Sequence, residues 1–176
     1  STNADAHCAL ADTYMKDKEY DKAILEYQKA SQLVPDNESV LIKLGNAYKA
    51  KSETKNALDM YQKVIFKNLK NTDAMFNAGL CYAELNDNNN AIKSFKNVIA
   101  IDPNYAYAYY ALGMAYENEK NYPESIANYE KFMTLTDDNE TKAQVKNQIE
   151  YLKNKNKKAK VFVIHRLDKD TSGVLM

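Results

Sequence analysis

Apolar and polar side chains alternate along most of this chain with the spacing of amphipathic helices. Positions 4, 7, 8 and 11 of four successive 34-residue segments are apolar or small, apart from His7. These positions lie on one face of a helix, with polar residues on the opposite face. Polar turn formers such as Asn86-Asp87-Asn88-Asn89 interrupt the pattern, and the chain has only 4 glycines and 3 prolines. The pattern predicts an all-α fold of long, regular helices.

The helical pattern repeats every 34 residues. Four tyrosines mark the period: Tyr14, Tyr48, Tyr82 and Tyr116. A small residue precedes each tyrosine by three positions: Ala11, Gly45, Gly79 and Gly113. An aromatic residue follows each tyrosine by 13 positions: Tyr27, Tyr61, Phe95 and Tyr129. A glycine inside a helix costs about 1 kcal/mol relative to alanine, so its recurrence predicts that a second helix approaches closely at this point.

This register resembles the tetratricopeptide repeat, a helix–turn–helix unit of 34 residues. The resemblance implies a right-handed superhelical solenoid of four units within residues 4–139: 4–37, 38–71, 72–105 and 106–139. Apolar residues then recur among Lys, Gln and Asn at 140–155, which predicts a capping helix with one polar face. We expect a basic linker at 156–160 and an extended tail at 161–176.

In the tetratricopeptide family, positions 2, 5, 9 and 12 of a unit point into a concave groove. The resemblance therefore implies the following groove residues, among which Asn77 is included because it matches a position of a carboxylate clamp found in the family: Asp12, Ile42, Asn46, Lys49, Phe76, Asn77, Leu80, Tyr107, Tyr110, Met114 and Glu117. Several are apolar where a solvated face would carry Lys, Glu or Gln, and exposed apolar patches usually mark binding sites. The alternative to a binding site is a tight superhelix in which the groove partly closes on itself. Aromatic rings and a flexible Met suit a peptide or protein segment as the partner.

Some members of the family clamp the carboxylate of a chaperone tail with Lys, Asn and Arg. Asn46 and Asn77 match two positions of that clamp. Ile42, Tyr107 and Ala111 stand where the clamp needs cations, so charge-assisted contact to a carboxylate is missing. Binding of this type is not expected.

Composition excludes several other classes of function. Lys+Arg and Asp+Glu are both 24, which gives no general attraction to nucleic acid or anionic membranes. The run Lys153–Lys160 is interpreted as a solvated helix end rather than a nucleic-acid site. Two distant cysteines and two histidines predict neither a disulfide framework, a metal site nor a cofactor. No apolar run is long enough to span a membrane. A cytoplasmic location is favoured, and a removed signal or anchor stays open because the chain does not begin with Met.

The last residues, VFVIHRLDKDTSGVLM, differ in character from the repeats. VFVI has the composition of a buried strand. HRLDKDTSG resembles the active-site motif of RluA-type pseudouridine synthases, in which the matching Asp168 is catalytic. A catalytic carboxylate must be positioned and shielded from water, and a short tail offers neither, so we expect no synthase activity. We also expect Phe162 and Ile164 to be able to occupy the apolar groove of their own or a neighbouring copy.

Taken together, the sequence predicts a non-enzymatic interaction scaffold that binds a peptide or protein segment in a concave groove. Two alternatives stay open. The chain could be the N-terminal part of a pseudouridine synthase fusion, inactive as this fragment, or it could be a self-assembling structural array.

Overall fold

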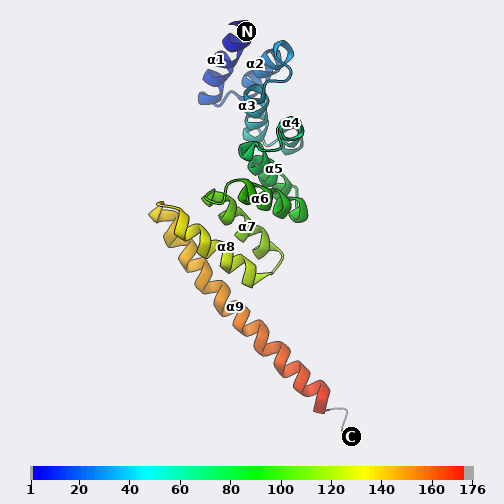
Figure 1. Cartoon of the computed structure of the whole chain (residues 1–176), viewed down its shortest axis with the longest axis vertical. Helices are drawn as coiled ribbons and strands as arrows, with labels where there is room; N and C mark the ends of the chain where they lie inside the picture. The colour runs from blue at the N-terminus through cyan, green and yellow to red at the C-terminus, as the bar shows by residue number, and fades with distance from the viewer. Residues whose placement is uncertain (1, 173–176) are drawn as a thin grey trace. The chain divides into compact units, whose positions relative to one another are not determined.

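The computed structural model describes the backbone of residues 2–172 and the side chains of residues 3–158. Every regular element in that part of the chain is an α-helix (Figure 1). The helices are α1 (Thr2–Lys16), α2 (Tyr20–Leu33), α3 (Glu38–Ala50), α4 (Thr54–Lys67), α5 (Thr72–Glu84), α6 (Asn88–Ile101), α7 (Ala106–Asn118), α8 (Tyr122–Leu135) and α9 (Asn139–Ser172). The predicted all-α repeat fold is confirmed.

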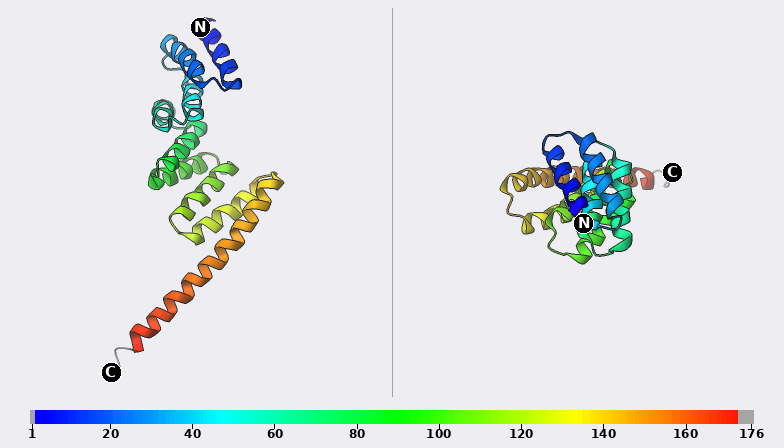
Figure 2. Two further views of the ribbon diagram at one scale, coloured as in Figure 1. Left: turned by 180° about the vertical axis from the view of Figure 1, so that it is seen from behind. Right: turned by 90° about the horizontal axis from the view of Figure 1, so that it is seen from above.

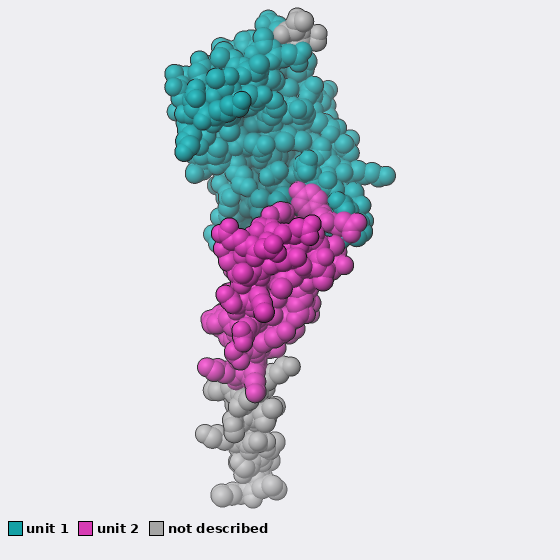
Figure 3. All heavy atoms as spheres, turned by 90° about the vertical axis from the view of Figure 1, so that its left-hand side faces the viewer, with its two compact units in different colours: residues 1–103 teal, residues 104–176 magenta. Residues whose placement is uncertain are grey.

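The chain forms two compact parts, which are described separately (Figure 3). The N-terminal part ends at Pro103 and the C-terminal part begins at Asn104. In the N-terminal part, α1 packs on α2, α3 on α4 and α5 on α6, and each hairpin contacts the next through α2 and α3 or α4 and α5. In the C-terminal part, α8 packs on α7 and on α9. Helices α3, α5 and α7 begin at residues 38, 72 and 106, where the 34-residue register places the start of a unit.

The turn inside each hairpin has one fixed backbone geometry. Lys18, Ser52, Asn86 and Lys120 all have positive φ, between 58° and 65°. The next residue donates its backbone N–H to the carbonyl of the repeated tyrosine, as from Glu53 to Tyr48 at 2.8 Å. This is the hydrogen bond of a left-handed helix cap, a position at which glycine is the usual residue. A side chain there costs roughly 1–2 kcal/mol of backbone strain.

Replacing Ser52 with glycine is therefore expected to stabilise the protein. We expect the free energy of unfolding to increase by about 0.5–1 kcal/mol, because the relief of backbone strain in the folded protein outweighs the entropic cost of ordering a more flexible unfolded chain. The matched control is Ser94→Gly inside α6, which should lose roughly 0.5 kcal/mol because glycine is a poor helix former. Urea denaturation followed by circular dichroism measures both, and a loss of stability in both variants would contradict the assignment of strain to Ser52.

The close approach of the two helices in a hairpin is confirmed at the repeated glycines. A Cβ atom added to Gly45, Gly79 or Gly113 would lie 2.8, 2.5 or 2.7 Å from an aromatic ring of the second helix. Those rings belong to Tyr61, Phe95 and Tyr129, each of which is buried. The glycine therefore makes room for a large ring that fills the centre of the hairpin.

Helix α9 caps α8 with one apolar face. Val145, Ile149 and Leu152 pack against Ile126 and Phe132 of α8. Exposed polar side chains occupy much of the rest of α9 up to residue 158. This is the division of faces that a terminal helix of a repeat array needs.

The prediction of an extended tail is wrong for residues 161–172, and the predicted linker at 156–160 is also helical. Figures 1 and 2 show α9 continuing past α8 as one helix, and it reaches Ser172. No glycine or proline interrupts α9, and a strand in an all-helical protein lacks a partner for its backbone groups. Helix formation satisfies those groups within the segment, which outweighs a strand preference of at most about 1 kcal/mol. The side chains of Phe162, Ile164 and Asp168 lie outside the described residues, as do the predicted tail contacts.

Candidate functional site

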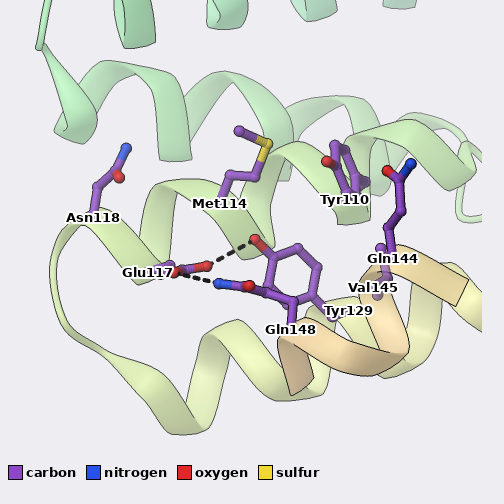
Figure 4. A pocket seen from close by; sticks show the side chains of 8 residues that line it. All are labelled: Tyr110, Met114, Glu117, Asn118, Tyr129, Gln144, Val145 and Gln148. Carbon is purple, nitrogen blue, oxygen red and sulfur yellow. Dashed lines mark hydrogen bonds between the residues drawn. The ribbon is translucent and has the colours of Figure 1, made fainter. Parts of the chain in front are cut away.

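A hollow of about 300 Å³ opens on the C-terminal part of the chain, beside α7 (Figure 4). It is lined by Tyr110, Met114, Glu117 and Asn118 of α7, Tyr129 of α8, and Gln144, Val145 and Gln148 of α9. The first three are residues that the repeat register assigns to the groove of the fourth unit. The structure therefore brings predicted groove residues together with side chains from two further helices.

Aromatic rings form a packed floor beside this hollow. The centroid of the Tyr110 ring lies 5.8 Å from that of Tyr129 and 5.2 Å from that of Phe132. Tyr107 stacks at a tilt on Phe132 at 5.7 Å and remains 48% exposed. Met114 is also 48% exposed and lines the hollow. The floor is thus held by core packing, whereas the flexible thioether of Met114 is available for contact.

Of the described residues that line the hollow, Glu117 is the only one with a charged side chain. Its Oε2 accepts a hydrogen bond from the Tyr129 hydroxyl at 3.1 Å, and its Oε1 accepts one from Gln148 Nε2 at 2.6 Å (Figure 4). Burial and the neighbouring Glu117 charge raise the pKa of Tyr129 well above its usual value, so this hydroxyl stays protonated and donates. Two neutral donors hold the carboxylate of Glu117 in one position.

In two other hairpins the central tyrosine also donates to a groove residue, but to the one at position 9 of its unit, whereas Glu117 is at position 12. Tyr61 donates to Asn46 Oδ1 at 2.6 Å, and Tyr27 donates to Asp12 Oδ1. In the third hairpin the ring is Phe95, which has no hydroxyl, and the groove residue there is Leu80. The ring and the residue at position 9 are therefore matched in polarity in the first three hairpins, whereas the fourth has Met114 at position 9 and its Tyr129 donates to Glu117 instead.

Asp12 is held by a second partner as well. Lys43 Nζ donates to Asp12 Oδ2 at 2.6 Å. Burial by itself would raise the pKa of Asp12, but the hydrogen bonds from Lys43 and Tyr27 outweigh it and keep this pKa below its usual value. Asp12 is thus an ionised carboxylate that is paired with a lysine, whereas no ion pair to Glu117 occurs among the residues that the structure describes.

The other predicted groove residues of the N-terminal part do not line this hollow. Ile42 packs against the core around Tyr61, and the Phe76 ring lies 5.7 Å from the Phe95 ring. Asn77 donates to the Asp73 carbonyl within its own helix at 2.9 Å. Lys49 and Leu80 are partly exposed. A role for these residues in binding stays a prediction.

A second hollow, of about 390 Å³, lies in the N-terminal part between α4, α5 and α6. Phe66 and Leu69 line it and are 86% and 71% exposed. The matching positions of the other units hold Gln32 and Pro35, Ala100 and Pro103, and Thr134 and Asp137. This surface was not predicted, although an apolar pair that breaks the repeat pattern was a signal for it.

Sequence reasoning also missed the contribution of α9 to the first hollow. Gln144 and Gln148 follow Tyr110 and Met114 by one further step of 34 residues. They therefore occupy groove positions of an incomplete fifth unit. Extending the repeat register into the capping helix would have found them.

Among the described residues, no group of three or more His, Cys, Asp or Glu side chains could hold a metal ion. No helix in the described part of the chain combines the length and apolar character that crossing a membrane requires.

Comparison with known proteins agrees with the repeat architecture. A family model described as TPR repeat matches residues 11–52 and 79–120, and a second, described as tetratricopeptide repeat, matches residues 106–139. Comparison with curated proteins finds no match.

Several solved structures share the fold. A crystal structure of MamA protein aligns with a TM-score of 0.78 at 22% identity, over 96% of this chain and 92% of that chain. MamA 41-end from Desulfovibrio magneticus RS-1 aligns with a TM-score of 0.73 at 17% identity, over 88% and 97%. MamA AMB-1 aligns with a TM-score of 0.66 at 25% identity, over 75% and 72%. Together the two family models cover more than half of the sequence, and the chain belongs to the tetratricopeptide repeat family.

Proposed function

We propose that this protein is a non-enzymatic interaction scaffold that binds a peptide or protein segment, and that part of the segment occupies the hollow beside α7. Membership of a family of interaction repeats favours this function over a pseudouridine synthase or a purely structural array. The hollow itself supports the more specific proposal that part of the bound segment lies beside α7. It combines apolar surface with a few fixed polar groups, which is the usual make-up of a binding site.

The observation that carries the proposal is the position of Met114. Its side chain is about half exposed, lines the hollow and lies in the same helix as the ring of Tyr110. An exposed methionine on a rigid aromatic floor adapts its shape to an incoming side chain at little cost. The backbone around it is held by α8, so the partner meets a largely preformed surface.

Met114→Ser is expected to weaken binding of a groove ligand about five- to tenfold, since it removes apolar area that the ligand would bury. Ligands can be selected from a random linear-peptide phage library on the immobilised protein. Their dissociation constants for wild type and variant are then measured by fluorescence anisotropy.

The matched control is Leu25→Ser, which removes a 52% exposed aliphatic side chain from α2 that is not among the residues lining the hollow. This variant should bind the selected peptides as wild type does. Circular dichroism establishes that both variants remain folded. Equal affinity of wild type and Met114→Ser for every selected peptide would remove the hollow beside α7 from the proposed function.

A further inference from the structure

We infer that the hollow beside α7 selects a positively charged side chain, lysine or arginine, of the bound segment, with Glu117 as its counter-charge. This inference rests on the proposed function and names the chemistry of the partner.

The first support is the charge of the hollow. The other lining side chains are aromatic, apolar or amide, and none is basic. Among the described residues, no Lys or Arg forms an ion pair with Glu117, whereas Asp12 and Glu26 each have a lysine partner. The hollow therefore carries one negative charge that no basic side chain in the described part of the chain compensates.

The second support is the unused hydrogen-bonding capacity of Glu117. A carboxylate accepts about four hydrogen bonds, and this one receives one on each oxygen. The donors are a hydroxyl and an amide, which fix the geometry but leave the charge in place. Each oxygen can still accept a hydrogen bond from an ammonium group, or both can accept from the two arms of a guanidinium group.

The third support is the surface around the carboxylate. Tyr110, Met114 and Val145 offer apolar flanks. The long methylene stem of lysine or arginine packs on such surfaces while the charged end reaches a polar partner. A neutral or acidic side chain would instead bury the Glu117 charge without compensation, which is costly. The hollow thus favours a basic residue through attraction and disfavours others through the desolvation of Glu117.

The test compares wild type with Glu117→Gln, which keeps the size of the side chain and an acceptor for the Tyr129 hydroxyl. The amide of Gln148 can rotate to accept from the new amide group. Random-peptide selection on wild type is expected to enrich Lys or Arg at one position, and selection on Glu117→Gln is expected to lose that enrichment. Glu150→Gln, on an exposed part of α9 outside the hollow, is the matched control and should retain it.

A second measurement uses a peptide selected on wild type and its counterpart with the basic residue replaced by methionine. The replacement should weaken binding to wild type about tenfold, as expected for a partly exposed charge-assisted hydrogen bond, and should change binding to Glu117→Gln little. Peptides that depend on Met114 but show no preference for a basic residue would overturn this inference and leave the proposed function intact. If no selected peptide depends on Met114, both fail.

Discussion

Phe95→Ala is expected to lower the free energy of unfolding by about 3–5 kcal/mol, the usual cost of removing a fully buried aromatic ring. The Phe95 side chain is 1% exposed, lies directly beneath Gly79 and contacts the ring of Phe76. It fills the centre of the third hairpin, so its removal leaves a cavity that neighbouring helices cannot easily close. Urea denaturation followed by circular dichroism measures the change.

The chain provides a control with the same chemical change. Phe66 is 86% exposed, and Phe66→Ala should alter the free energy of unfolding by no more than about 0.5 kcal/mol. The comparison separates burial from any general effect of losing a phenyl ring. Similar losses in the two variants would contradict the central packing role given to Phe95.

Gly79→Ala is expected to destabilise the protein by about 1–3 kcal/mol, although the same change normally stabilises a helix by about 1 kcal/mol. The added Cβ would lie 2.5 Å from a ring atom of Phe95. This ring is buried between helices and cannot move away without shifting α6 relative to α5. Overpacking therefore exceeds the gain in helix propensity.

Two further variants test the cause of this effect. In the first hairpin Ala11 already occupies the equivalent position and is fully buried, so Ala11→Gly should cost about 1–2 kcal/mol through helix propensity and the loss of a buried methyl group. Phe95→Leu creates space beneath residue 79, so the double variant Gly79→Ala/Phe95→Leu should be more stable than the sum of the single losses predicts. A stabilising Gly79→Ala, or strict additivity with Phe95→Leu, would show that the close contact does not limit stability.

The repeat register explains why so much of the fold could be predicted from the sequence. A hairpin depends on contacts between residues close in the chain, such as Gly79 with Phe95, and these contacts recur at a fixed spacing. The period therefore revealed the helices, the small-to-large pairing and the tetratricopeptide family. It also placed Tyr110, Met114 and Glu117 correctly on the helix that lines the hollow.

The prediction for the tail failed for a different reason. The strand prediction for Val161 to Ile164 rests on their intrinsic strand preference, which is weak and depends on context. No strand occurs in residues 2–172, so this segment has no strand to pair with. Its backbone N–H and C=O groups form hydrogen bonds within a helix instead. Local composition could not supply this information about the surroundings.

The sequence by itself determined the repeated hairpins and the position on α7 of Tyr110, Met114 and Glu117, which line the hollow, because contacts between residues close in the chain recur at a fixed spacing. Only the tertiary structure decided that Tyr129 and Gln148 both donate to Glu117, and that no cation in the described part of the chain pairs with this carboxylate. Those features depend on side chains from three helices meeting in space, and the distance between such residues along the chain carries no signal of how their charges and hydrogen bonds are balanced.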